Sequence, residues 1–258
     1  MSEKLHYSKW GNGPDTMLLF HGYGQDNAVF ADYKDQRYTF YSVDLFFHGK
    51  SEWSKGEQPL EKSEWKTIID SLLKDNAIQT FSVLGFSMGG KFAMATLEQF
   101  PNRVKEIILL APDGVKTSTW YSLATYPIAF RNLFKSMIAN HERFLRIASA
   151  SKKLGLIDKG VLRFVATQMD SEEKRKRVYY SWVVFRHLKF DIGKMARLIN
   201  ENKITFSLFT GRYDKIITAA NMNRLVSGIP NSKFEILDAG HNNLVNAFFT
   251  YRSRPERE

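Results

Sequence analysis

Short apolar segments alternate with helix-like segments along most of this 258-residue chain, and this alternation constrains its fold more than any other feature. The apolar segments are rich in aliphatic, aromatic and β-branched residues and end at glycines or polar loops, which predicts buried strands. Strands are predicted at 15–20, 38–45, 80–85, 104–111, 204–210 and 233–237, and helices at 63–76, 91–99, 219–227 and 243–251. Such alternation predicts a mostly parallel, twisted sheet with helices on both faces, the α/β class.

The middle of the chain breaks this alternation. Residues 120–197 contain several helix-like stretches and no convincing strand. One stretch is an apolar stripe with helical spacing over 130–138. Another begins at Asp170, where Glu173 three positions later predicts a capping box that opens a helix through Phe185. We therefore predict that this segment is an all-helical insertion.

The positive charge of the chain is concentrated in the same segment. The chain has 37 Lys and Arg against 27 Asp and Glu, a formal net charge of +10. Residues 113–197 hold 17 of the basic and 7 of the acidic residues, so the remainder has 20 of each and is neutral. This contrast predicts two parts. They are a core formed by 1–112 and 198–258, and a basic helical lid formed by 113–197.

Composition excludes several classes of protein. Hydrophobic residues make up 43% of the chain, enough for a core, so global disorder is excluded. The absence of cysteine excludes disulfides, thiolate catalysis and cysteine-ligated metals. No apolar run is long enough to predict a transmembrane helix, and residues 1–20 lack the apolar stretch of a signal peptide. We expect a cytoplasmic enzyme or binding protein.

The sequence Gly85-Phe86-Ser87-Met88-Gly89 falls where a predicted strand passes into a predicted helix. In such a turn, called a nucleophile elbow, the serine stands on a strained backbone that lifts its hydroxyl clear of the chain. Glycines flank it because side chains there would collide with the neighbouring strand or helix. A serine hydroxyl needs a base that takes its proton. Ser87 is therefore a candidate nucleophile if the fold brings a base to it.

A candidate base and a candidate acid follow the last two predicted strands. They are His241 and, before it in the chain, Asp214. A carboxylate beside a histidine fixes the tautomer of the imidazole and stabilises the imidazolium that forms. We predict that Ser87, Asp214 and His241 form a catalytic triad. Asp113, after the strand at 104–111, is the alternative acid, because some hydrolases place it there; the sequence around Asp214 favours Asp214.

An oxyanion hole should accompany the triad, because negative charge develops on the carbonyl oxygen of the substrate during attack. The backbone N–H of Met88 lies at the start of the predicted helix, directly after the nucleophile. Tyr23 follows His21-Gly22 at the end of the first buried strand, and its backbone N–H is the natural second donor. We predict that these two N–H groups form the hole.

In these motifs the chain resembles the α/β-hydrolase superfamily, in its single-domain, esterase-like branch. The matching pieces span nearly the whole chain in family order: His21-Gly22-Tyr23-Gly24, Asp44 with His48-Gly49-Lys50-Ser51, Gly85-Phe86-Ser87-Met88-Gly89-Gly90, Gly211-Arg212-Tyr213-Asp214 and Gly240-His241. The resemblance implies a Ser-His-Asp hydrolase that needs no cofactor, with a helical lid inserted after the sixth strand and the active site between core and lid. Ser87 argues against the chemistry of relatives that use an aspartate nucleophile, such as haloalkane dehalogenases and epoxide hydrolases.

Four residues near these motifs are interpreted as structural. His21 is expected to pack within its loop. His48, which stands where many relatives have glycine, is expected to belong to a structural turn, with a place in the pocket lining as the alternative. His6 has no partner pattern. Lys91, just past the elbow, is expected to point away along its helix.

The excess charge of the predicted lid suggests partners. The run Lys174-Arg175-Lys176-Arg177 is expected to be a solvated helix start, because consecutive helical residues point about 100° apart and cannot form one patch. A broader set of lid cations should attract anions. This set is Arg131, Lys135, Arg143, Arg146, Lys152, Lys153, Lys159 and Arg163. A membrane surface, an acyl carrier protein and a coenzyme A ester are the candidate partners, and solubility alone is the simplest interpretation. Nucleic acid is not expected, because no recognition motif accompanies the charge.

Together these features predict a serine hydrolase that cleaves a small-molecule carboxylic ester through an acyl-enzyme intermediate, with neither cofactor nor metal. Aromatic side chains of the lid would supply an apolar wall, and the candidates are Trp120, Tyr126, Phe130 and Trp182. Two alternatives stay open. One is an esterase or thioesterase that acts on an acyl group bound to an anionic carrier, and the other is a non-hydrolytic ligand-binding or sensor protein with the same fold.

Overall fold

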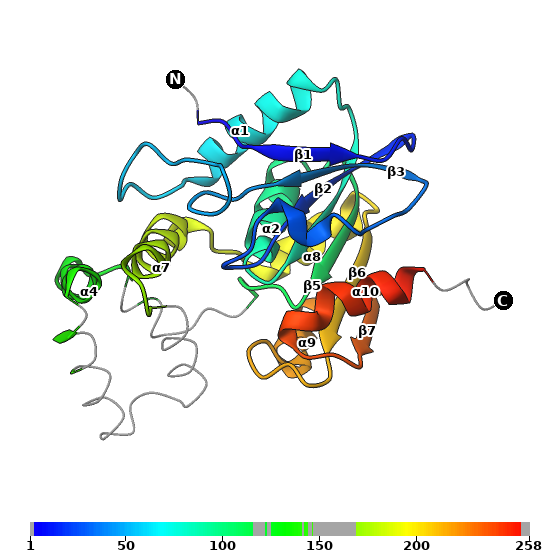
Figure 1. Cartoon of the computed structure of the whole chain (residues 1–258). Coiled ribbons are helices and arrows are strands. Elements are labelled where there is room, and N and C mark those ends of the chain that lie inside the picture. The colour runs from blue at the N-terminus through cyan, green and yellow to red at the C-terminus, as the bar shows by residue number, and fades with distance from the viewer. Residues whose placement is uncertain are drawn as a thin grey trace. The chain divides into compact units, whose positions relative to one another are not determined.

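The structure, a computed structural model, describes residues 3–115, 122, 125–140, 142–143, 146 and 169–253. Within these residues a seven-stranded sheet has the order β1-β3-β2-β4-β5-β6-β7 (Figure 1). The strands are β1 (Tyr7–Trp10), β2 (Asp15–Phe20), β3 (Tyr38–Val43), β4 (Phe81–Phe86), β5 (Val104–Leu110), β6 (Thr205–Gly211) and β7 (Lys233–Leu237). β1 pairs with β3 in antiparallel fashion, and the other neighbouring strands of this sheet are parallel.

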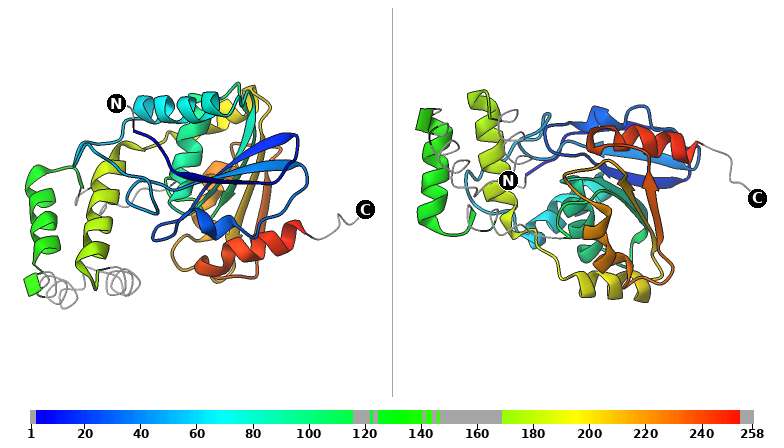
Figure 2. Two further views of the ribbon diagram at one scale, coloured as in Figure 1. Left: turned by 45° about the horizontal axis from the view of Figure 1, so that its top comes forward. Right: turned by 90° about the horizontal axis from the view of Figure 1, so that it is seen from below.

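Helices cover both faces of this sheet (Figure 2). On one face lie α1 (Lys62–Asp75), α2 (Gly89–Gln99) and α8 (Ile192–Glu201), and on the other lie the 3-10 helix η1 (Asn27–Phe30) and α10 (Leu244–Arg252). Three short elements complete this part: η3 (Ala219–Met222), α9 (Asn223–Val226) and η4 (His241–Asn243).

Alternation of side chains along each strand builds an apolar layer on both faces of the sheet. In β2, Met17 and Leu19 join the buried cluster that contains Phe248 of α10. Phe20 points to the other face, where its ring centroid lies 5.8 Å from that of Trp65 of α1. Burial on both faces explains why these strands read as continuous apolar runs in the sequence.

The chain divides into two compact units. The first contains Met1–Ser54, Glu61–Lys116 and Leu188–Glu258, and the second contains Lys55–Leu60 and Thr117–His187. The sheet described above belongs to the first unit.

In the second unit, α4 (Ile128–Ala139) packs against α7 (Glu172–Val184), which is followed by the 3-10 helix η2 (Phe185–His187). The ring of Phe134 on α4 contacts the rings of Tyr179 and Trp182 on α7. The apolar stripe predicted over 130–138 is split by this packing. Phe134 and Ile138 are buried, whereas Phe130 and Leu133 are 46% and 44% exposed.

The division into units runs differently from the predicted core and lid. The lid is predicted over 113–197, whereas the second unit ends at His187 and includes Lys55–Leu60. Helix α8 therefore belongs to the first unit, where Ile192, Met195 and Ile199 are buried. The role of residues 113–197 as a lid stays a prediction.

The predicted strands and helices of the core are confirmed to within two residues at each end, with three differences. The helix predicted at 219–227 is a 3-10 turn followed by the short α9. Strand β1 was not predicted. The helical segment follows β5, the fifth strand in the chain, so the expectation of an insertion after the sixth strand is wrong. In the described residues a single strand, β1, precedes β2.

The start of α7 also differs from the prediction. The capping residue is Ser171, whose hydroxyl accepts a hydrogen bond from the backbone N–H of Lys174 at 3.2 Å. The Asp170 carboxylate instead pairs with the Lys174 ammonium at 2.9 Å. The helix therefore begins at Glu172, one residue later than a cap at Asp170 would place it.

Several residues singled out in the sequence lie outside the described residues. They are Trp120, Lys152, Lys153, Lys159 and Arg163. Among the helices in the described ranges, none has the length and apolar composition needed to cross a bilayer.

Candidate active site

Ser87 stands in the turn between β4 and α2, at the position predicted for the nucleophile. Its φ is +50°, in the left-handed region that non-glycine residues rarely adopt. Such strain persists where the surroundings hold the backbone firmly. The Ser87 N–H donates to the Leu110 carbonyl at 2.9 Å, and the Ser87 carbonyl accepts from the N–H groups of Gly90 at 2.9 Å and Asp113 at 2.8 Å.

The glycines that flank Ser87 are required by close backbone approaches. A Cβ on Gly89 would lie 2.0 Å from the Phe20 carbonyl oxygen, and a Cβ on Gly85 would lie 2.6 Å from the Gly89 carbonyl oxygen. Both distances are far shorter than a van der Waals contact. The elbow is thus pressed against the end of β2, where the loop that contains Tyr23 begins.

His241 joins Ser87 to Asp214 by two hydrogen bonds. In η4, directly after β7, its Nε2 lies 2.9 Å from Ser87 Oγ and its Nδ1 lies 2.6 Å from Asp214 Oδ2. Three residues that are 27 and 154 positions apart in the chain are therefore brought together as predicted. The imidazole also lies against Phe86, with ring centroids 5.1 Å apart.

The Asp214 carboxylate is held from two sides. The side chain is fully buried in the loop after β6. While Oδ2 faces His241, Oδ1 accepts hydrogen bonds from the backbone N–H groups of Ile216 at 2.8 Å and Ile217 at 2.9 Å. These hydrogen bonds hold the carboxylate in one orientation, in which it can orient an imidazole and stabilise its protonated form.

Asp113, the alternative acid, has a different partner. Its Oδ2 lies 2.8 Å from the Nζ of Lys91 on α2. The acid that is hydrogen-bonded to His241 is Asp214. The expectation that Lys91 points away along its helix is wrong, because its buried side chain turns toward the segment after β5.

The two predicted oxyanion donors lie on neighbouring segments. Met88 is the N-terminal capping residue of α2, and Tyr23 lies in the loop after β2. This loop is close to the elbow, because a Cβ on Gly22 would lie 2.9 Å from the Phe86 ring. Backbone N–H groups at a helix N-terminus favour negative charge, which suits an oxyanion.

His21 anchors the loop that carries Tyr23. It is fully buried, and its Nε2 accepts a hydrogen bond from the Leu45 N–H at 3.0 Å. Its Nδ1 must then carry the proton, which it donates to the Gly22 carbonyl at 2.7 Å. Burial lowers the pKa of His21 to about 4, so the imidazole is neutral near pH 7. This agrees with its predicted packing role.

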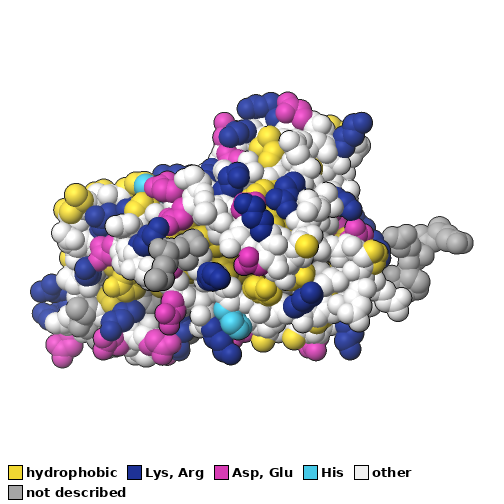
Figure 3. Space-filling view, turned by 90° about the horizontal axis from the view of Figure 1, so that it is seen from above, with side chains coloured by type: hydrophobic (Ala, Val, Ile, Leu, Met, Phe, Trp, Pro, Cys, Tyr) yellow, Lys and Arg dark blue, Asp and Glu magenta, His cyan; other side chains and the backbone are white. Residues whose placement is uncertain are grey.

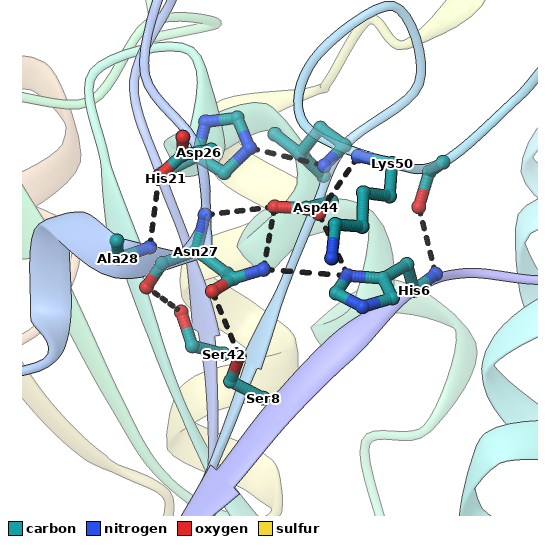
Figure 4. Close-up of polar contacts among 11 residues, drawn as sticks. His6, Ser8, His21, Asp26, Asn27, Ala28, Ser42, Asp44 and Lys50 are labelled. Carbon is teal, nitrogen blue, oxygen red and sulfur yellow. Dashed lines mark hydrogen bonds and ion pairs between the residues drawn. The ribbon is translucent and has the colours of Figure 1, made fainter.

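Asp44 organises the neighbouring loop through its buried carboxylate (Figure 4). Oδ1 accepts from the backbone and side-chain nitrogens of Asn27, both at 2.8 Å, and Oδ2 accepts from the Lys50 N–H at 2.9 Å and faces His6 Nδ1 at 2.8 Å. Burial raises the pKa of Asp44, but these hydrogen bonds outweigh it and hold the pKa below its ordinary value. Sequence reasoning missed Asn27 and gave His6 no partner, and no local pattern marks either contact.

His48 lies within the turn that Asp44 organises, consistent with its predicted structural role. It is buried, and its Nδ1 lies 3.0 Å from the Phe46 carbonyl oxygen. Its ring packs edge-on against the ring of Tyr23, with centroids 5.2 Å apart. The loops after β2 and β3 therefore support each other beside the elbow.

A serine on a tight strand-to-helix turn, followed in the chain by an aspartate and a histidine after later strands, is the arrangement of α/β hydrolases. A sequence profile described as "alpha/beta hydrolase fold" matches residues 15–248. The chain therefore belongs to the α/β-hydrolase family.

Esterases and other hydrolases are among the known proteins that the chain resembles. The chain is 27% identical over 172 residues to a pimeloyl-[acyl-carrier protein] methyl ester esterase of Nitrosomonas europaea; the match covers 62% of this chain and 65% of that protein, less than two thirds of its length. It is 23% identical over 259 residues to a 2-hydroxy-6-oxononadienedioate/2-hydroxy-6-oxononatrienedioate hydrolase of Paraburkholderia phymatum, which covers 92% of this chain and 84% of the relative. A thermophilic esterase from Thermogutta terrifontis shares the fold, with a TM-score of 0.67, 17% identity and coverage of 96% and 91%.

Proposed function

We propose that the protein hydrolyses carboxylic esters, with Ser87 as nucleophile, His241 as general base and Asp214 as the residue that orients His241. His241 carries this assignment, because its two ring nitrogens contact the other two side chains at 2.9 and 2.6 Å. A histidine held only for packing would not need both a buried carboxylate and the hydroxyl of a strained serine.

In the first half of the reaction His241 Nε2 takes the proton of Ser87 Oγ, and the oxygen attacks the carbonyl carbon of the ester. The negative charge that forms on the carbonyl oxygen is stabilised by the backbone N–H groups of Tyr23 and Met88. Asp214 stabilises the imidazolium. When the tetrahedral intermediate collapses, His241 returns the proton to the leaving alcohol and the acyl group stays on Ser87.

In the second half a water molecule takes the place of the alcohol. His241 accepts a proton from this water, and the resulting oxygen nucleophile attacks the acyl carbon. Collapse of the second intermediate releases the carboxylic acid, and the proton on His241 returns to Ser87 Oγ. In this scheme one imidazole moves every proton.

The test is turnover of p-nitrophenyl acetate by the wild type and by Ser87→Ala. The substitution removes one oxygen from a side chain that is partly exposed, so the fold should remain. We expect kcat to fall by a factor of at least about 10³, since only the oxyanion hole and binding would remain. Ser82→Ala, a buried serine on β4, is the matched control and should keep near wild-type activity. Full turnover by Ser87→Ala would refute the mechanism.

A second candidate substrate is an ester carried by an anionic protein or cofactor. The name of the Nitrosomonas europaea relative includes an acyl carrier protein, and residues 113–197 hold the excess of basic charge. Part of this charge is matched locally on α7, where Lys174, Lys176 and Arg177 pair with Asp170, Glu172 and Glu173. On the face drawn in Figure 3, basic and acidic side chains are likewise interspersed.

Salt separates this candidate from a neutral ester. Attraction between exposed charges weakens as the Debye length shortens to about 8 Å at 0.15 M and about 3 Å at 1 M salt. Turnover of a carrier-bound ester should therefore drop steeply with salt, while turnover of p-nitrophenyl acetate should not. Equal salt responses would contradict a role for the basic residues.

A non-hydrolytic binding role is the remaining alternative. Labelling by a fluorophosphonate, mapped to Ser87, would contradict this role, because reaction requires an aligned nucleophile and base. The cytoplasmic location expected from the sequence stays a prediction.

A further inference from the structure

An ion pair between a buried lysine and a partly exposed aspartate lies directly beside the nucleophile turn. Lys91 is the third residue of α2, four positions after Ser87, and its Nζ lies 2.8 Å from Asp113 Oδ2. The Lys91 side chain is 10% exposed and the Asp113 side chain 41% exposed. The pair joins the first turn of α2 to the segment after β5, two parts of the chain that are 22 residues apart.

Asp113 also holds the backbone of Ser87. Its N–H donates to the Ser87 carbonyl at 2.8 Å, and its Oδ1 accepts from the Gly114 N–H at 2.7 Å. The Lys91 side chain thus closes a ring: from Ser87 along the first turn of α2, across the ion pair to Asp113, and back through the hydrogen bond to Ser87.

The strained residue of the site, Ser87, is a member of this ring. Ser87 needs support to keep its φ of +50°, because nothing intrinsic to a serine favours that conformation. The segment after β5 fits tightly against the turn, since a Cβ on Gly90 would lie 2.4 Å from Pro112 Cβ. A movement of this segment would therefore displace the Ser87 carbonyl and, with it, the Ser87 hydroxyl.

Stability alone gives no reason for a lysine here. Burying an ammonium group is costly, and a cation near a helix N-terminus opposes the helix dipole. A surface ion pair contributes little to stability, and even a buried pair can often be replaced by apolar residues without loss. The pair is better explained by the position in which it holds the segment after β5 relative to the nucleophile turn.

We propose that Lys91 and Asp113 are positioning residues for the nucleophile. Their ion pair holds residues 111–114 against the elbow, so that the Ser87 hydroxyl stays aligned with His241 Nε2. This inference rests on the proposed role of Ser87 in ester hydrolysis.

The test compares Lys91→Met, Asp113→Asn, the double variant and Lys91→Arg. Met removes the charge and keeps most of the volume, Asn keeps the backbone N–H that holds Ser87, and Arg restores the charge. The matched control is Lys62→Met, which breaks the partly buried pair of Lys62 with Glu98 at the other end of α2. The readouts are kcat and KM on p-nitrophenyl acetate, the rate constant for fluorophosphonate labelling of Ser87, and stability in urea.

We expect Lys91→Met and Asp113→Asn each to lower kcat and the labelling rate constant about 10-fold, with KM changed less than about 2-fold, because small misplacements of a reacting group are costly. The double variant should be no slower than either single variant, since both substitutions break the same contact. Lys91→Arg should recover most of the rate, and Lys62→Met should leave it unchanged. A purely structural role would lower the fraction of Ser87 that is labelled and the stability in urea, not the rate constant of the folded sites.

Two results would overturn the inference. The first is labelling of Ser87 at the wild-type rate in folded Lys91→Met. If that variant does not fold, the same result in Asp113→Asn counts. The second is an equal loss in Lys62→Met. If the wild type labels at Ser87 and turns over ester, such results remove the positioning role alone. If the wild type does neither, the proposed function is wrong as well.

Discussion

The buried His21 makes the stability of the protein depend on pH in a way that the structure allows us to calculate. The pKa of His21 is lowered from 6.5 to about 4, chiefly by burial. The unfolded chain, where the pKa is ordinary, therefore binds the proton more readily at intermediate pH. The contribution of neutral His21 to stability is complete above about pH 6.5 and is lost as the pH falls toward 4. Lowering the pKa from 6.5 to about 4 corresponds to about 3 kcal/mol of stability.

The assay is urea unfolding of the wild type and His21→Gln at several pH values between about 7.5 and 4. Glutamine does not titrate, and its amide oxygen can accept the hydrogen bond from Leu45 N–H that His21 Nε2 now accepts. As the pH falls across this range, the free energy of unfolding of the wild type should thus decrease by about 3 kcal/mol more than that of His21→Gln. Protonation of carboxylates also changes the stability in this pH range, but it does so in both proteins and largely cancels when the two are compared. A difference that stays constant across this range would refute the reasoning.

Two further predictions concern the triad acid and the start of α7. Asp214→Asn should lower kcat about 10⁴-fold, because an amide no longer selects the reactive tautomer of His241. The control is Asp238→Asn, at an exposed aspartate three residues before His241. A loss of kcat of less than 10-fold in Asp214→Asn would contradict the assignment of Asp214 as the triad acid. Ser171→Ala should lower the free energy of unfolding by about 1 kcal/mol, because it removes the side-chain acceptor for Lys174 N–H. Asp170→Ala should cost less if Ser171 is the cap, and the reverse order in urea unfolding would restore Asp170 as the capping residue.

Most of the sheet could be predicted because its central strands are buried on both faces. The runs at 15–20 and 104–111 each end in four or more consecutive apolar residues, as parallel strands between two helical layers do. β1 escaped prediction because its sequence, Tyr-Ser-Lys-Trp, is short and only partly buried. It is the one antiparallel strand of the described sheet and lies at its edge.

α8 (Ile192–Glu201) was predictable in part, but the predicted boundary between core and lid, after residue 197, falls inside it. Its buried residues Ile192, Met195, Ala196 and Ile199 follow helical spacing, and Asp191 caps it by accepting from Lys194 N–H. These signals mark a helix clearly. They do not say which unit it packs against, because that depends on contacts with α2 that are remote in the sequence.

The candidate triad could be predicted because each member follows a strand. To predict that Ser87, Asp214 and His241 lie close together, only one rule is needed: parallel strands present their carboxyl ends at the same edge of a sheet. The supporting contacts could not be predicted. The pairs of Lys91 with Asp113 and of His6 with Asp44 join residues 22 and 38 positions apart through side chains whose direction no local pattern sets.

The most direct test of the central claim is the mass of the protein during turnover. The wild type is mixed with a p-nitrophenyl ester, quenched in acid within milliseconds and digested for peptide mapping. We predict a single acyl group on the peptide that contains Ser87, which disappears as the ester is consumed. An ester that is hydrolysed while this peptide stays unmodified, or an acyl group that accumulates on another residue, would contradict nucleophilic catalysis by Ser87.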